Sequence, residues 1–307
     1  MPQLFRYYRE GQSVNREKLR AWVQASRPPF FVATLIPLTA GAVLAGRQGS
    51  FSFLPFIMVL FGSFLVHFAT NISNDYFDHL QGTDAGASIG GSRVLQEGKI
   101  SMKELGRAII LLYAVAAIIG FYLTWTLKLW ALIPLMILAF FSSLFYVAPP
   151  VRYGYHGLGE FFVAINMGPV MVLGSNWVLL GRVDWAPLPI SLPIGLMVAL
   201  IMYYQNLPDL ETDRATGKKT LAVRLGKKGA LYFLLAFWFL IYVSIAMLTV
   251  TGYFSPIAWG TLLTLPILIK LWRIIVSTRD WVELDLHGKY IRIFYFINGM
   301  ILIAALF

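Results

Sequence analysis

The sequence predicts an all-α protein that crosses a membrane many times. Hydrophobic residues make up 58% of its 307 residues, charged residues make up only 13%, and the mean hydropathy is +0.69. A soluble protein of this length carries roughly twice as much charge. Apolar runs of about 18 residues or more recur along the whole chain, which is typical of transmembrane helices.

The apolar segments predict nine transmembrane helices in one bundle. They cover approximately residues 28–46, 51–73, 107–126, 129–148, 158–180, 186–206, 230–251, 255–275 and 289–306. We therefore expect one transmembrane domain over residues 28–307, preceded by a cytoplasmic or interfacial segment over residues 1–27. In that segment Leu19, Trp22 and Val23 share one face of a helix, which predicts an amphipathic helix at the membrane surface.

Positive charge is distributed unevenly between the two ends of these helices. With the N-terminus in the cytoplasm, all but three of the 25 Lys and Arg residues fall on the cytoplasmic side, and Arg47, Lys128 and Arg182 are the exceptions. This pattern satisfies the positive-inside rule and places the C-terminus outside. We expect an integral protein of a prokaryotic inner membrane. The net charge of +10 then reflects topology and attraction to anionic lipids or substrates, not nucleic-acid binding.

Two clusters of acidic and amide side chains lie at the cytoplasmic ends of predicted helices. In the first cluster Asn71, Asn74, Asp75 and Asp78 are spaced i, i+3, i+4, i+7 and share one helical face, and Asp84 follows. Taken alone, the cluster is also consistent with a simple polar stop and turn at the end of a helix.

The second cluster has the same plan. Asp209 and Asp213 are spaced i, i+4 at the end of the sixth predicted helix, and Gly217, Lys218 and Lys219 follow. This cluster alone is again consistent with a solvated helix end. Because both clusters are predicted on the same side of the membrane, they favour one shared site.

The residue types in these clusters indicate a magnesium site. Carboxylate and amide oxygens favour Mg²⁺, and the chain contains no cysteine for a thiolate site. Mg²⁺ usually binds through one or two carboxylates plus phosphate oxygens, so a diphosphate is its natural partner. Cations such as Arg93, Lys218 and Lys219 stabilise the charge that develops on a departing diphosphate. The sequence therefore indicates chemistry between a lipid diphosphate, held by the apolar helices, and an acceptor.

At these residues the chain resembles the UbiA superfamily of intramembrane aromatic prenyltransferases. The resemblance runs from about Arg27 to the C-terminus and is carried by Asn74-Asp75-x-x-Asp78 and by Asp209-x-x-x-Asp213-x-x-x-Gly217-x-x-Thr220. It implies nine helices with both acidic loops in the cytoplasm. It also implies transfer of a polyprenyl group from a polyprenyl diphosphate to a small aromatic acceptor, with Mg²⁺ as the cofactor.

Within the superfamily, the chain is most similar to the 1,4-dihydroxy-2-naphthoate polyprenyltransferase branch of menaquinone biosynthesis. The stretches 74–84, 91–98, 153–160 and 209–213 carry this similarity. Members that act on hydroxybenzoate tend to have an aspartate four residues after the second motif aspartate. This chain has Gly82 there, and its third carboxylate comes at Asp84. The difference argues against the hydroxybenzoate branch.

The resemblance implies a role for each candidate residue. The expected Mg²⁺ ligands and catalytic carboxylates are Asp75, Asp78, Asp209 and Asp213, with Asp84 as a further candidate ligand and Asn71 and Asn74 assisting. The residues expected to contact the diphosphate are Arg93, Lys218, Lys219 and Arg27. Tyr146 and Tyr153 are expected to line the pocket and to stabilise the allylic cation. Glu160 fits both a partner of a helix N-terminus and an acceptor-binding residue. His67 fits a satisfied contact between helices better than a ligand.

Other functions are compatible with parts of this pattern. A related enzyme would act on hydroxybenzoate, homogentisate, a porphyrin or a glyceryl phosphate, or would cyclise the prenyl chain without an acceptor. A transporter would use the carboxylates as an ion path, but such proteins usually carry charge near the membrane midplane. A lipid-binding protein of the same fold would bind the diphosphate without turnover. Prenyl chain length depends on helix packing, and no motif predicts it.

Overall fold

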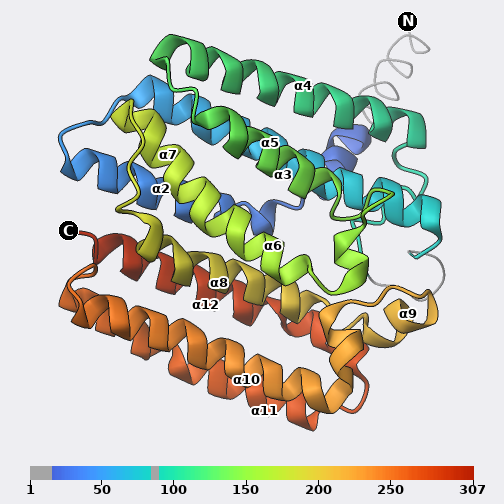
Figure 1. Ribbon diagram of the computed structural model, residues 1–307. Helices are drawn as coiled ribbons and strands as arrows, with labels where there is room; N and C mark the ends of the chain where they lie inside the picture. The colour runs from blue at the N-terminus through green and yellow to red at the C-terminus, as the bar shows by residue number, and fades with distance from the viewer. Residues whose placement is uncertain (1–15, 84–89) are drawn as a thin grey trace, which may run out of the picture.

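A computed structural model of the chain describes residues 16–83 and 90–307, and all the regular elements in these ranges are helical (Figure 1). After a helix over residues 16–26, the elements are η1 Pro28–Phe30, α2 Val32–Arg47, α3 Phe53–Gln81, α4 Met102–Leu127, α5 Leu132–Leu144, η2 Tyr153–His156, α6 Gly159–Ile165, η3 Asn166–Val170, α7 Met171–Leu180, α8 Leu188–Gln205, α9 Leu210–Ala215, α10 Leu221–Val250, η4 Pro256–Thr264, α11 Leu265–Ser277, η5 Trp281–His287 and α12 Gly288–Ala304. The long helices run side by side, and the short α9 lies at one end of the bundle (Figure 1).

The predicted membrane character is confirmed. Among the described residues, six helical segments are long and apolar enough to cross a membrane, and the bent pair over residues 16–47 adds a seventh. Two further predicted spans contain the shorter helices α5, of 13 residues, and α12, of 17 residues. The count of nine spans therefore stays a prediction.

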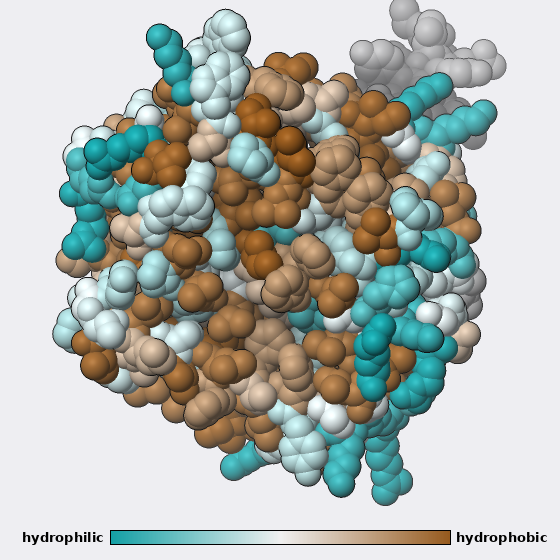
Figure 2. Space-filling view, viewed as in Figure 1, coloured by the Kyte–Doolittle hydropathy of each residue, from teal (hydrophilic) through white to brown (hydrophobic). Residues whose placement is uncertain are grey.

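The outer surface fits a lipid environment. On the visible face hydrophobic side chains cover most of the middle, and hydrophilic ones gather toward the end where α9 lies (Figure 2). On α4, for example, Ile110, Ile118 and Trp125 are all exposed. Apolar side chains so widely exposed are unfavourable in water and favourable in contact with lipid.

Both acidic clusters are positioned by the way their helices end. Helix α3 continues to Gln81, well past its predicted end at residue 73, and stops where Gly82 adopts a left-handed conformation with φ of 72°. The first cluster is therefore helical, as predicted. The second cluster follows the end of the sixth span closely but starts a new helix. Helix α8 ends at Gln205, and Asp209 precedes the separate helix α9, because Pro208 disfavours helical geometry at the residue before it.

The helix over residues 16–26 packs against the first acidic region. Ala21 and Ala25 are buried in a cluster with Ala69 and Ile72 of α3. Leu19 is 65% exposed and Val23 is 50% exposed, which agrees with an apolar face turned to the membrane surface. The division of the chain at residue 27 into a segment and a domain stays a prediction.

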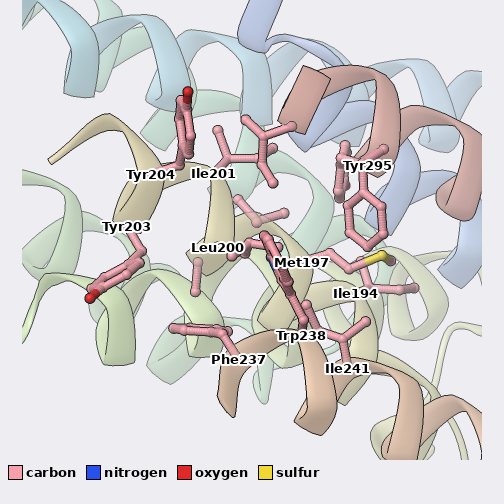
Figure 3. Packing of buried hydrophobic residues seen from close by; sticks show 14 of the residues in the cluster. Ile194, Met197, Leu200, Ile201, Tyr203, Tyr204, Phe237, Trp238, Ile241 and Tyr295 are labelled. Carbon is pink, nitrogen blue, oxygen red and sulfur yellow. The ribbon is translucent and has the colours of Figure 1, made fainter. Parts of the chain in front are cut away.

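Helix α8 forms the centre of the hydrophobic core (Figure 3). Its residues Met197 and Tyr203 pack with Phe237 of α10 and Tyr295 of α12. The two tyrosine hydroxyls on α8 are satisfied by backbone carbonyls: that of Tyr203 donates to Ala230 at 2.9 Å and that of Tyr204 to Leu284 at 2.8 Å. Large apolar side chains therefore pack α8, α10 and α12 together, and α9 follows α8 in this part of the bundle.

Helices α2 and α7 approach closely at Gly41. An added Cβ there would lie 2.4 Å from the Val172 carbonyl oxygen and 2.9 Å from Ser175 Cβ. At Gly46, on the same helix, an added Cβ would meet only Phe51 Cβ, at 4.0 Å. Small residues at such crossings allow membrane helices to pack backbone to backbone.

This difference predicts opposite effects of one substitution at two positions of α2. Gly41→Ala should destabilise the protein by about 1–3 kcal/mol because backbone atoms must move apart. Gly46→Ala should be neutral or slightly stabilising because alanine favours a helix. Thermal unfolding of both variants in detergent measures the effect. Equal midpoints for the two variants would contradict the packing of α2 on α7.

Candidate functional site

The polar site lies where the end of α3 meets α9, at the right-hand end of the bundle in Figure 1. Its central contact joins the two acidic clusters. The ammonium of Lys218 lies 3.5 Å from Asp78 Oδ2 and 3.7 Å from Asp213 Oδ1. Gly217 adopts φ of 80°, and the Lys218 amide donates to the Asp213 carbonyl at 2.8 Å. This turn after α9 brings the Lys218 side chain back beside Asp213.

Tyr155 of η2 completes this contact, although sequence reasoning assigned it no role. Its hydroxyl donates to Asp78 Oδ1 at 2.6 Å, and the ammonium of Lys218 lies 5.3 Å from its ring centroid. The Lys219 amide donates to the Tyr155 carbonyl at 3.0 Å, which ties η2 to the segment after α9. The sequence signal was present, since Tyr155 falls within the stretch 153–160, but only the fold shows which partner it has.

Asp75 is held by different partners. Its carboxylate accepts a hydrogen bond from the guanidinium of Arg27 and from the hydroxyl of Ser92, and the Ser92 amide donates to Asp75 Oδ1 at 3.0 Å. Gly91, with φ of 80°, allows the chain to turn so that Ser92 faces α3. Asp75 is 3% exposed, so these donors compensate a buried charge. Sequence reasoning did not identify Ser92.

Three other predicted residues flank these carboxylates. The Asn71 amide donates to the Ser26 carbonyl at 3.0 Å, which fixes the first helix against α3. Asp209 caps the start of α9, and its carbonyl accepts a hydrogen bond from the Asp213 amide at 2.7 Å. Asn71, Asn74 and Asp209 all line the same cavity as Asp78, Asp213 and Lys218.

Burial and neighbouring charge shift the pKa values in this loop region. Burial raises the pKa of Asp213 to about 6; the cation of Lys218 opposes this shift, and Asp209 and Asp78 add to it. Burial disfavours the charged form of Lys218, but Asp78 and Asp213 hold the pKa of Lys218 well above its usual value. Lys218 therefore remains a cation. An additional positive charge near Asp213 would favour the ionised form of the Asp213 carboxyl group.

The donor atoms at this site fit a magnesium ion. Two buried oxygens, Asn74 Oδ1 and Asp213 Oδ2, have no hydrogen-bond partner. Within residues 16–83 and 90–307, no three His, Asp or Glu side chains converge closely enough to form a complete metal cage. Mg²⁺ does not require such a cage, because it keeps water and takes phosphate oxygens as ligands. Asp84 lies outside the described residues.

A cavity of about 1100 Å³ extends from this polar end into the bundle. One stripe of α3 lines it, from Asp78 through Asn71 and His67 to Gly62 and Met58. The walls beyond the polar end are mostly apolar and come from α4, α5 and α7. The cavity can therefore hold a molecule with a charged head and a long apolar tail.

Tyr146 and Tyr153 line the cavity. Their ring centroids lie 5.5 Å apart with an interplanar angle of 72°, and the Tyr153 hydroxyl donates to the Ser142 carbonyl. Gly154 and Gly159 leave room for Tyr146, because an added Cβ at either would lie 3.0 Å or less from its ring. Both rings therefore form part of the cavity wall, in one hydrophobic cluster with Tyr155.

The remaining candidate residues do not contact Asp78, Asp213 or Lys218 in the described contacts. Neither Arg93 nor Lys219 belongs to the described residues that line the cavity. Glu160, in the first turn of α6, is buried and accepts a hydrogen bond from the Asn206 amide at 3.0 Å. His67 Nδ1 lies 2.6 Å from Thr34 Oγ1, which agrees with a satisfied contact between helices.

Known proteins resemble this chain both in sequence and in fold. Over 261 residues the chain is 31% identical to the 1,4-dihydroxy-2-naphthoate octaprenyltransferase of Bacillus subtilis, covering 84% of this chain and 83% of that one. It is 32% identical over 268 residues to the enzyme of the same name from Haemophilus influenzae, covering 83% and 85%.

Solved structures share the architecture at lower identity. A UbiA homolog from Archaeoglobus fulgidus, bound to GPP and Mg²⁺, superposes with a TM-score of 0.60 at 15% identity, covering 92% of this chain and 99% of that one. A digeranylgeranylglyceryl phosphate synthase structure superposes with a TM-score of 0.64 at 18% identity, covering 94% and 99%.

The family model for UbiA prenyltransferases matches residues 34–284, which include both acidic clusters, the tyrosine pair and Lys218. The match covers most of the chain and agrees with the bundle, the polar end and the apolar cavity described above. The chain belongs to the UbiA prenyltransferase family.

Proposed function

We propose that this protein transfers a polyprenyl group from a polyprenyl diphosphate to 1,4-dihydroxy-2-naphthoate, as in menaquinone biosynthesis, with Mg²⁺ as the cofactor. The observation that carries the proposal is the continuity of the cavity. It joins Asp78, Asp213 and Lys218 at one end to apolar walls deep in the bundle. Relatives in two bacteria that carry the name of this reaction support the choice of acceptor.

Asp78, Asp209 and Asp213, with Asn74, are the residues best arranged to hold Mg²⁺. All four line the cavity, and Asn74 Oδ1 and Asp213 Oδ2 lack a hydrogen-bond partner. When bound, Mg²⁺ would neutralise the negative charge of the diphosphate. Asp75 remains a predicted ligand, and its binding to a metal would require Arg27 to release it. Asp84 and Asn71 keep their predicted roles as a candidate ligand and an assisting residue.

Lys218 is the cation best positioned for the diphosphate. Its side chain is only 14% exposed and lines the cavity beside Asp78 and Asp213. As the bond between the prenyl carbon and the diphosphate oxygen breaks, the electron pair stays on the diphosphate. A fixed ammonium stabilises this developing charge better than solvent does. Arg27, Arg93 and Lys219 are proposed as secondary diphosphate contacts reached by local rearrangement.

We assign Tyr146 and Tyr153, which line the cavity, to the carbon that loses the diphosphate. Aromatic faces attract cations, so the rings stabilise the allylic cation while the apolar walls exclude water. An electron-rich ring carbon of the acceptor then forms the new carbon–carbon bond. In the naphthoate reaction, loss of the ring carboxylate as carbon dioxide restores the aromatic system.

We further propose that the polar end faces the cytoplasm of a prokaryotic cell and that the C-terminus lies outside. The distribution of Lys and Arg between the loops supports this orientation. A reporter that fluoresces only in the cytoplasm should be dark at the C-terminus and bright in the segment after α9. Fluorescence at the C-terminus would mean an even number of spans and would contradict the topology.

The choice of acceptor is tested with purified protein, Mg²⁺ and a polyprenyl diphosphate. We expect a prenylated, decarboxylated product from 1,4-dihydroxy-2-naphthoate and none from 4-hydroxybenzoate, as measured by mass spectrometry. A product from hydroxybenzoate alone would overturn the choice of acceptor and leave the prenyl transfer intact. Release of diphosphate without any prenylated acceptor would overturn the transfer itself.

The acidic site is tested by two neighbouring carboxylates of α9. Asp213→Asn should lower kcat/KM by about 100-fold, which is typical for loss of one group that stabilises developing charge. It should also raise the Mg²⁺ concentration needed for half-maximal activity. Glu211→Gln is the matched control, because Glu211 is exposed and forms surface ion pairs with Arg214 and Lys227. Equal loss of activity in both variants would argue against a metal or diphosphate role for Asp213.

A further inference from the structure

A buried carboxyl group that the proposed reaction does not use lies behind the cavity wall. Glu160 is 4% exposed, and it is not among the described residues that line the cavity. Its Oε1 accepts a hydrogen bond from the side-chain amide of Asn206 at 3.0 Å, and its carboxyl group also accepts one from its own backbone amide. Burial of a carboxyl group is unfavourable unless such donors compensate it. The two hydrogen bonds therefore fix Glu160 at the start of α6, directly behind Asn206.

Asn206 is the member of this pair that reaches the cavity. It caps the C-terminal end of α8, and its side-chain nitrogen donates to Glu160. Within the described residues no donor reaches its side-chain oxygen, and this oxygen is not among the buried atoms that lack a partner. The oxygen is therefore accessible, and the accessible surface of Asn206 lies in the cavity wall. Asn206 Oδ1 offers the cavity a hydrogen-bond acceptor.

This acceptor atom lies on the side of the cavity formed by Tyr146. Met202 and Asn206 are spaced i, i+4 at the end of α8 and so share one face. An added Cβ on Gly159, the residue before Glu160, would lie 3.0 Å from Tyr146 Cε2 and 3.3 Å from the sulfur of Met202. The start of α6 and the end of α8 thus meet beside the ring that we assign to the carbon that loses the diphosphate.

The chemistry of the two substrates decides what the Asn206 carbonyl oxygen can bind. A carbonyl oxygen accepts hydrogen bonds and donates none. The diphosphate offers acceptor oxygens, so it is not a partner for this atom. An aromatic acceptor with two hydroxyl groups supplies O–H donors, and it has to approach the prenyl carbon beside Tyr146.

We infer that Glu160 is a positioning residue, which orients the Asn206 amide so that the carbonyl oxygen receives a ring hydroxyl of the aromatic acceptor. The inference rests on the proposed function and adds to it the contact by which a hydroxylated acceptor is recognised. Without Glu160 the amide is free to rotate, because nothing else in the described residues holds its nitrogen. Its N–H groups then take the place that the hydroxyl needs.

The test measures the binding of two naphthoates to the purified full-length protein by titration calorimetry in detergent. The first, 1,4-dihydroxy-2-naphthoate, has a carboxylate and two hydroxyls, whereas 2-naphthoate has the carboxylate alone. Glu160→Met keeps the length of the side chain and removes its oxygens. Its affinity for the dihydroxy compound should fall about tenfold, the effect of one hydrogen bond, and its affinity for 2-naphthoate should stay within about twofold of wild type.

Two further variants assign the effect to the contact between Glu160 and Asn206. Glu160→Gln keeps an oxygen that accepts from Asn206, so its affinity for the dihydroxy compound should stay within about threefold of wild type. Asn206→Leu should weaken binding of the dihydroxy compound as Glu160→Met does. The double variant should lose no more affinity than Asn206→Leu alone, because both changes remove the same contact. If Glu160→Met does not fold, Asn206→Leu provides the same comparison between the two naphthoates.

Glu104→Met is the matched control. Glu104 is also a carboxylate in the first turn of a helix, where it forms a capping box with Ser101 at the start of α4. It is not among the described residues that line the cavity. This variant should lower the midpoint of thermal unfolding and leave both affinities unchanged.

Each outcome separates this inference from the proposed function. Equal loss of affinity for both naphthoates, no loss for either, or additive losses in the double variant would overturn the role of Glu160. An unchanged affinity of Asn206→Leu for the dihydroxy compound, with a higher Mg²⁺ requirement for activity, would assign the Asn206 carbonyl to the metal instead. The calorimetry needs no turnover, so a wild type that binds the dihydroxy compound without prenylating it would overturn the proposed transfer.

Discussion

The contact of the Lys218 ammonium with the carboxylates of Asp78 and Asp213 is the interaction on which the polar end of this protein depends. Lys218 and Asp78 are 140 residues apart in the sequence and belong to different halves of the bundle. Two carboxylates that are mostly buried would repel each other without a cation between them. Lys218 compensates both charges and so holds α3 and the segment after α9 together. Tyr155 strengthens this arrangement through its hydrogen bond to Asp78.

The same requirement explains the neighbouring contacts. Asp75 is almost fully buried, and it is satisfied by Arg27 and by Ser92, which lie in segments before and after α3. Each acidic residue of the first cluster is therefore bound to a different part of the chain. In this state protein cations and hydroxyls hold the carboxylates. A bound metal would replace the protein cations at the carboxylates, and a diphosphate would bind those cations. Lys218 is already in the position proposed for stabilising the negative charge of the departing diphosphate.

The apolar part of the cavity has a separate physical basis. Its lining combines small residues of α3 and α4, such as Gly62 and Gly120, with large ones, such as Leu123 and Leu132. The charged end and the apolar part of the cavity are built from different residues and can therefore change independently.

The sequence by itself determined the membrane class, the two acidic clusters and the family, because hydropathy and motif spacing are local properties of the chain. It also predicted one shared site for Asp78, Asp209, Asp213, Lys218 and Tyr146, and all five residues line the same cavity. It did not predict the separate helix α9, which begins directly after Asp209. Only the tertiary structure decided that Lys218 bridges the two clusters, that Tyr155 and Ser92 hold the carboxylates, and that Met136 packs against Gly120. These contacts join residues far apart in sequence, and their distances follow from how complete helices pack, which no local pattern encodes.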